Sequence, residues 1–134
     1  MNPTTKSSPT KLAGARLAVK TGKKSLPAIG SDIADPAVKE SSYDATPLAA
    51  AVSLFADGLK PLSKKYGSIK VPLLLVTSKN DHVVNPEESD FLAKKYAGSV
   101  ERVFLDRSFH VATQDYEKDV IHQRALEFAK RVLA

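Results

Sequence analysis

Seven consecutive residues, 71–77, constrain the fold of this 134-residue chain more than any other segment. They read Val-Pro-Leu-Leu-Leu-Val-Thr and contain no charged residue. A strand covered on one face alternates apolar and polar residues, whereas a strand buried on both faces is continuously apolar. The run therefore predicts a strand of a parallel sheet that helices cover.

Two further segments indicate a helix and a second strand after this one. Residues 101–105 (Glu-Arg-Val-Phe-Leu) predict the second short strand. Between the two strands, Asn85 as N-cap, Pro86 at the first helical position and the carboxylate of Glu88 form a helix-start pattern. Gly98 then supplies a helix stop. We therefore expect a strand–helix–strand unit with a right-handed crossover between parallel strands.

Before this unit, prolines and small polar residues predict a loop or tail over residues 1–10 and an extended linker over residues 26–46. A short helix is expected between them, around residues 12–19.

Helices are also expected directly before and after the strand–helix–strand unit. Thr46 as N-cap and Pro47 at the first helical position predict the earlier helix. Gly58 and Pro61 should kink or break its second half. The last helix is expected to be capped by Asp115, and its apolar stripe consists of Ile121, Ala125, Phe128 and Val132. The order helix, strand, helix, strand, helix is typical of an α/β fold.

Two loops leave the carboxyl ends of the expected strands, and each carries a residue with acid–base chemistry. Asp81 lies four residues past the first strand, and His110 lies five residues past the second. Parallel neighbouring strands end at one edge of the sheet, where open α/β sheets bind ligands. There a carboxylate can accept the imidazole N–H, fix the tautomer and stabilise the imidazolium. The alternative interpretation is that both side chains are solvated surface residues.

The sequences around both residues resemble segments of α/β-hydrolases. Residues 69–76 (Ile-Lys-Val-Pro-Leu-Leu-Leu-Val) and 80–84 (Asn-Asp-His-Val-Val) are similar to the strand and the acid-bearing loop of that superfamily. A second resemblance is to bacterial carboxylesterases and monoacylglycerol lipases. The pattern around the catalytic histidine of these enzymes is matched here by Ser108, His110, Val111 and Asp115. The resemblance is strong over residues 69–133 and weaker over residues 26–68, which are similar to the cap above the active site.

The resemblance implies a partial α/β-hydrolase fold, the C-terminal half of such a protein. It would hold part of the helical cap and the last two parallel strands with their helices. On this basis the chain divides into a basic, poorly ordered leader (1–25), a cap-like helical segment (26–68) and a C-terminal α/β-hydrolase segment (69–134).

The same resemblance assigns roles to individual residues. Asp81 would be the acid and His110 the general base of a Ser-His-Asp triad, while Asp115 would cap the last helix rather than react. Phe55 and Val83 are candidates for the wall of a substrate pocket, although an amphipathic helix also packs such side chains in its core. The implied substrate is a small-molecule carboxylic ester, and no cofactor is implied.

The nucleophile of this family has no recognisable counterpart in the sequence. It should stand in Gly-x-Ser-x-Gly, well before the acid. The chain has six glycines, and no two of them are four residues apart. The serines near the motifs, none on a glycine-flanked turn, are Ser78, Ser89, Ser99 and Ser108. We therefore expect that the sequence begins after the nucleophile and that the chain alone is inactive.

Composition and charge argue against nucleic-acid binding, metal binding and a membrane-spanning segment. Residues 1–25 hold six basic groups and no acid, whereas the remainder is nearly balanced, with 14 basic and 15 acidic groups. The basic segment lacks the aromatic residues that stack on single strands, so we interpret it as solvated and expect no nucleic-acid partner. With no cysteine, and with His82, His110 and His122 lacking metal-ligand spacing, we expect no metal site. No apolar run reaches the roughly 20 residues of a membrane span, and we expect a cytoplasmic location.

Two classes of function remain open. In the first, the chain comes from a serine-type carboxylic ester hydrolase lineage and needs an N-terminal half that carries the nucleophile. In the alternative, it is a non-catalytic homodimerising or partner-binding module derived from an α/β-hydrolase. Either way, the edge of strand 71–77 that lacks its earlier neighbours is expected to pair with another chain.

Overall fold

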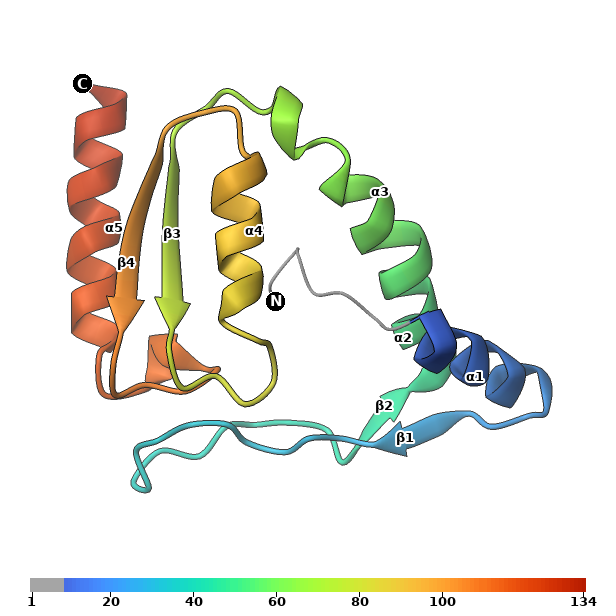
Figure 1. Cartoon of the computed structure of the whole chain (residues 1–134). Coiled ribbons are helices and arrows are strands. Elements are labelled where there is room, and N and C mark those ends of the chain that lie inside the picture. The colour runs from blue at the N-terminus through green and yellow to red at the C-terminus, as the bar shows by residue number, and fades with distance from the viewer. Residues whose placement is uncertain (1–8) are drawn as a thin grey trace.

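A computed structural model of the chain describes residues 9–134. The tail expected over residues 1–10 therefore lies mostly outside the described residues. Figure 1 shows the elements in space. In chain order they are α1 (Pro9–Lys20), β1 (Ser25–Pro27), β2 (Ala45–Pro47), α2 (Leu48–Ser53), the π-helix η1 (Leu54–Leu59), α3 (Lys60–Ser63), the short 3₁₀ turn η2 (Tyr66–Ser68), β3 (Leu73–Ser78), α4 (Glu87–Lys95), β4 (Val100–Leu105), the 3₁₀ turn η3 (Ala112–Gln114) and α5 (Lys118–Leu133).

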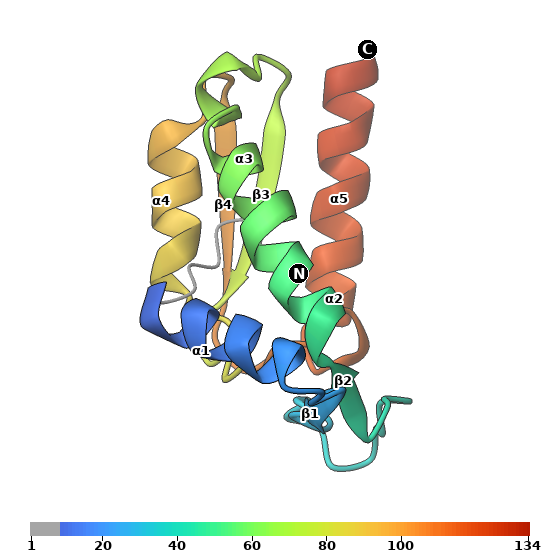
Figure 2. The ribbon, with the colours of Figure 1, turned by 90° about the vertical axis from the view of Figure 1, so that its right-hand side faces the viewer.

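The predicted α/β fold is confirmed around β3 and β4. The two strands are parallel, in a register that pairs Leu73 with Val100 and Ser78 with Leu105. Both views place this strand pair between α4 and α5, and both helices contact β3 (Figures 1 and 2). Val103 and Leu105 of β4 are buried, whereas Leu73 to Val76 of β3 are only half-buried. Within the described residues each strand pairs on one side only, so part of each strand stays accessible.

The helix starts differ slightly from those expected. Helix α2 begins at Leu48 with Pro47 as its N-cap, and α4 begins at Glu87 with Pro86 as its N-cap, each one residue later than predicted. Asn85 still contributes to the start of α4, because its Oδ1 accepts the Glu87 N–H at 3.0 Å. A cap can thus satisfy the first N–H groups from just outside the helix.

The expected irregularity near Gly58 and Pro61 is present. The helix that begins at Leu48 widens into η1 over Leu54–Leu59 and returns to α geometry in α3, whose first turn contains Pro61. Proline has no N–H to donate to the preceding turn, so a local change in hydrogen-bond spacing there is expected.

Part of the basic leader is helical. The short helix expected around residues 12–19 lies within α1, and Gly22 ends that helix with φ of +92°. The N–H groups of Gly22 and Lys23 donate to Val19 and Ala18, which is the hydrogen-bond pattern of a glycine-terminated helix. The division of the chain into leader, cap-like and C-terminal segments stays a prediction.

The stretch predicted as an extended linker, residues 26–46, is held at both ends. Its ends form the antiparallel pair β1–β2, in which Leu26 faces Thr46. Between them, residues 28–44 run past the carboxyl ends of β3 and β4 (Figure 1). Within the described part of the chain, no helix is long and apolar enough to cross a membrane.

Candidate active site

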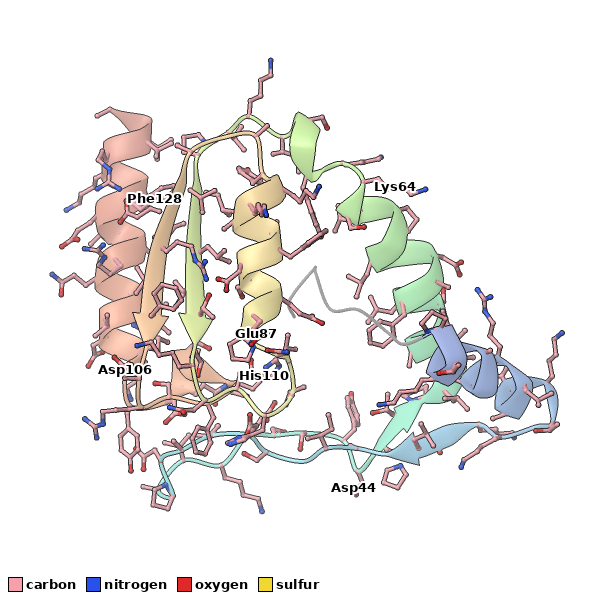
Figure 3. All side chains as sticks on the ribbon, in the orientation of Figure 1. Asp44, Lys64, Glu87, Asp106, His110 and Phe128 are labelled. Atoms are coloured by element: carbon pink, nitrogen blue, oxygen red, sulfur yellow. The ribbon has the colours of Figure 1, made fainter. Side chains whose placement is uncertain are left out.

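The two residues singled out from the sequence meet at the carboxyl ends of β3 and β4. His110 Nδ1 lies 2.8 Å from Asp81 Oδ2, and both side chains are largely buried. His110 lies on the loop after β4, and Figure 3 shows it near Glu87 at the start of α4, on the side of the molecule where the two strands end. The parallel pairing of the strands produces this juxtaposition, as expected from the sequence.

Asp81 is held so that one of its oxygens faces His110. Its Oδ1 accepts the N–H groups of Val83 and Val84 at 2.8 and 2.7 Å, and its Oδ2 contacts the imidazole. An ionised carboxylate only accepts hydrogen bonds, so this contact requires the ring proton on Nδ1. Nε2 is then the nitrogen that can take up a proton, and within residues 9–134 it has no hydrogen-bond partner.

A hollow of about 510 Å³ lies beside this pair, and both Asp81 and His110 line it. Much of the rest of its wall is apolar, formed by Leu75, Val76, Val84, Pro86, Val111 and Ile121. Neither Phe55 nor Val83 lies in this wall. Their assignment to a substrate pocket therefore stays a prediction.

The nearby serine hydroxyls have other partners or positions. The Ser78 hydroxyl donates to the carbonyl oxygen of Ser108, and the Ser108 hydroxyl donates to Glu117 Oε2 at 2.9 Å. Ser89 lies in α4 and lines the hollow, and Ser99 precedes β4. In the part of the chain that the structure describes, no serine hydroxyl hydrogen-bonds to His110.

A third carboxylate, Asp32, joins the site without having been predicted. It is 8% exposed, and its Oδ2 accepts the backbone N–H groups of His82 and His110, both at 3.1 Å. Burial raises the pKa of Asp32, but hydrogen bonds from the His82 ring and from these two N–H groups outweigh burial and lower that pKa. Asp32 stands in the linker, 50 and 78 residues from its partners, so no local pattern identifies it.

His82 makes contacts to two other segments of the site although much of it faces solvent. Its side chain is 61% exposed, yet its Nδ1 lies 2.8 Å from Asp32 Oδ1. Its ring also packs edge-to-face on Phe109, with the centroids 4.5 Å apart. The residue after Asp81 is therefore tied both to the linker and to the loop that carries His110.

The prediction that Asp115 caps the last helix is wrong. Helix α5 begins at Lys118, and Asp115 is 1% exposed in the loop before it. Its carboxylate instead accepts four backbone N–H groups at 2.8–3.1 Å, those of Ala34, Asp35, Phe109 and Tyr116. Burial raises the pKa of Asp115, but these four hydrogen bonds outweigh burial and lower it.

Glu117 holds the same loop from the other side. Its carboxylate accepts the N–H groups of Asp106, Arg107 and Ser108, together with the Ser108 hydroxyl. Burial raises the pKa of Glu117, and these hydrogen bonds more than reverse that effect, so the pKa is lowered. The loop between β4 and His110 is thus fixed by the buried carboxylate of Asp115 and the half-buried carboxylate of Glu117 rather than by secondary structure.

The described residues contain no group of three or more His, Cys, Asp or Glu side chains arranged to hold a metal ion. What the site offers chemically is an imidazole whose Nδ1 is held by a carboxylate and whose Nε2 is available. That arrangement suits general base catalysis.

No protein-family model matches the chain. Over 104 residues it is 38% identical to a thermostable monoacylglycerol lipase of Bacillus sp. (strain H-257). The matched residues make up 77% of this chain and 41% of that lipase. A solved structure from work on the metagenome-derived lipolytic enzymes LipS and LipT matches 96% of this chain and 51% of its own, with a TM-score of 0.85 and 32% identity.

A second solved structure, the monoacylglycerol lipase of Paleococcus ferrophilus, matches 92% of this chain and 52% of its own, with a TM-score of 0.73. At 18% identity this likeness concerns the fold. The chain spans about half, or less, of the length of each of these proteins. It belongs to the α/β-hydrolase superfamily and corresponds to the C-terminal half of a carboxylesterase- or monoacylglycerol lipase-like protein.

Proposed function

We propose that the chain supplies the acid and the general base of a serine-type carboxylic ester hydrolase, with Asp81 as the acid and His110 as the base. The observation that carries the proposal is the 2.8 Å contact between His110 Nδ1 and Asp81 Oδ2. Further support comes from the clamping of Asp81 Oδ1 by two N–H groups, which fixes the direction of Oδ2. The lipolytic enzymes that the chain resembles support the reaction class.

In this proposal His110 moves a proton at Nε2. As a serine hydroxyl attacks the ester carbonyl carbon, Nε2 takes the hydroxyl proton, and it later gives that proton to the leaving alcohol oxygen. A water molecule then attacks the acyl-serine in the same way, releasing the carboxylic acid and restoring the serine. Asp81 stays ionised throughout and stabilises the imidazolium through Nδ1.

The nucleophile is proposed to come from an N-terminal half. The solved lipolytic structure extends for about as much chain again beyond the matched part, and such a half would carry the serine and the oxyanion donors. The proposed substrate is a carboxylic ester with a short or medium acyl group, monoacylglycerols included, because the Bacillus relative is a monoacylglycerol lipase. Phe55 and Val83 stay candidates for contacts to the acyl chain.

The test replaces the matched segment of the Bacillus lipase with this chain and measures hydrolysis of p-nitrophenyl butyrate. The unfused chain is expected to be inert and the chimera active. Within the chimera, Asp81→Asn should lower kcat by about 10⁴ and His110→Ala by up to ~10⁶, because the triad acts as a unit. His122→Ala is the matched control, since His122 lies exposed on α5, and it should leave kcat unchanged.

Each part of the proposal can fail separately. Turnover by the unfused chain that is lost in His110→Ala would show that it holds its own nucleophile. Full activity of the chimera with His110→Ala would remove His110 as the base. Should the chimera not fold, proton NMR of the isolated chain tests the hydrogen bond between His110 and Asp81. A far-downfield signal of the His110 Nδ1–H is expected, and it should vanish in Asp81→Asn.

The alternative, a non-catalytic partner-binding module, draws on the edge of β3. Within the described residues β3 pairs only with β4, and Leu73 to Val76 are half-exposed. Instead of self-association, we propose that a strand of the N-terminal half covers this edge. The solved lipolytic structure contains about as much further chain as the part that matches this one, and that further chain could provide such a strand. Sedimentation of the chain alone and with the N-terminal half of the Bacillus lipase tests this. A 1:1 complex supports that occupant, and a stable homodimer unaffected by the added half favours the alternative.

A further inference from the structure

We infer that Asp32 is a positioning residue that ties the Asp81 loop to the His110 loop and so sets the geometry of the proposed catalytic pair. The inference rests on the proposed function, because it concerns how that pair is held. Asp32 belongs to the segment between β1 and β2, far in sequence from both loops.

One oxygen of Asp32 makes the connection. Its Oδ2 accepts the backbone N–H of His82, the residue after Asp81, and the backbone N–H of His110 itself, each at 3.1 Å. The carboxylate is largely buried, so both hydrogen bonds form away from bulk water, where an unmade bond is costly. The acid and the base are thus each held, within one residue, by the same atom.

Further contacts make this connection rigid. Asp32 Oδ1 lies 2.8 Å from His82 Nδ1, and the Asp32 carbonyl accepts the Val111 N–H at 3.1 Å. In the opposite direction, Asp115 accepts the N–H groups of Ala34 and Asp35. The segment past the strand ends in Figure 1 is therefore fastened to the His110 loop from both sides.

The consequence for catalysis comes from the origin of the two loops. Asp81 follows β3 and His110 follows β4, so their separation depends on two backbone segments that can move independently. A displacement of about 1 Å in catalytic geometry can cost ~10²-fold in rate. In the chimera with the Bacillus lipase, replacing Asp32 is thus expected to lower kcat by roughly 10–10². KM should change little, because the groups that line the hollow remain.

The experiment compares Asp32→Ala with Asp32→Asn and with the control Asp44→Ala. Asn keeps one acceptor oxygen for the two N–H groups, whereas Ala keeps none. Asp44 is exposed on the same segment and lies away from His110 in Figure 3. In the isolated chain, Asp32→Ala should weaken the His110 Nδ1–H signal and speed amide exchange at His82 and His110. Asp32→Asn should restore most of both, and Asp44→Ala should change neither.

The outcomes separate this inference from the proposed function. If Asp81→Asn abolishes the Nδ1–H signal and the activity of the chimera while a folded Asp32→Ala changes neither, the positioning role is overturned. If the wild-type chain has no Nδ1–H signal and Asp81→Asn leaves the chimera active, the proposed function itself fails. Should Asp32→Ala not fold, Asp32→Ser takes its place with the same expected losses, since its shorter side chain cannot reach both N–H groups.

Discussion

Asp115→Ala is expected to destabilise the chain strongly, although Asp115 lies outside the proposed chemistry. The substitution removes the acceptor of four backbone N–H groups, on Ala34, Asp35, Phe109 and Tyr116. A buried N–H left without a partner costs about 1–3 kcal/mol. Water entry and loop relaxation recover part of that sum, so we expect a net loss of roughly 3–5 kcal/mol, a large share of the ~5–15 kcal/mol typical of a domain.

Urea unfolding followed by circular dichroism measures this loss as a lower midpoint with an unchanged slope. Asp115→Asn, which keeps one acceptor oxygen, should lose less. The control is Asp119→Ala, in the first turn of α5, where an exposed carboxylate contributes about 1 kcal/mol or less through the helix dipole. A loss below about 1 kcal/mol in Asp115→Ala would refute the assignment of Asp115 as the anchor of this loop.

The same variant has a distinct pH dependence. The pKa of Asp115 is lower in the folded chain than the roughly 3.9 of an unfolded aspartate, so its carboxylate stabilises the fold fully above that pH. This stabilisation is lost as the pH falls through the folded pKa. The wild-type chain should therefore lose stability more steeply than Asp115→Ala between about pH 5 and pH 2. Part of the slope should remain in the variant, because the pKa values of Asp32 and Glu117 are also lowered. Equal slopes would contradict the argument.

Two further substitutions test the packing of the loops. Gly98→Ala should lower the thermal midpoint by several degrees, because its Cβ would meet the carbonyl of Lys70 at 2.8 Å and that of Val71 closer still. Gly14→Ala, in open space on α1, is the matched control and should be neutral or stabilising by up to ~1 kcal/mol. Glu117→Ala should cost about 1–3 kcal/mol in urea unfolding, because it removes the acceptor of the Ser108 N–H and hydroxyl, which are part-buried, and of the Asp106 and Arg107 N–H groups, which water can reach. A cost equal to that of Asp119→Ala would argue against this.

The parts of the fold that could be predicted are those with local causes. The apolar run at 71–77 indicates a covered strand, and helix-start and helix-stop residues delimit α4 to within a few residues. Once the two strands are parallel, the positions of Asp81 and His110 past their ends bring the two side chains together. The glycine at 98 marks the end of the α4 region, but its physical requirement is the close approach of the backbone at Lys70 and Val71.

The features that could not be predicted depend on contacts between distant residues. The sequence places Asp32 in a linker and suggests a helix cap at Asp115, because an acid near a helix start is ordinarily a capping signal. The actual partners of Asp115 include two N–H groups 80 and 81 residues earlier in the chain. A backbone N–H carries no side-chain signature, so a carboxylate that binds such groups produces no sequence pattern. The β1–β2 pair also produces no sequence pattern, because all of its residues are exposed and no apolar alternation marks either strand.

The hydrogen bonds of Asp81 and Asp32 indicate which parts of the proposed active site this chain can form without the N-terminal half. The hydrogen bonds to Asp81 come from Val83, Val84 and His110, and those to Asp32 come from His82 and His110, all within this chain. The geometry of the acid–base pair therefore depends on contacts that an N-terminal half does not need to supply. Such a half would add the nucleophile, the oxyanion donors and a strand for the open edge of β3. The Nδ1–H signal of His110 should accordingly persist in the isolated chain, while hydrolysis should appear only when the two halves are joined.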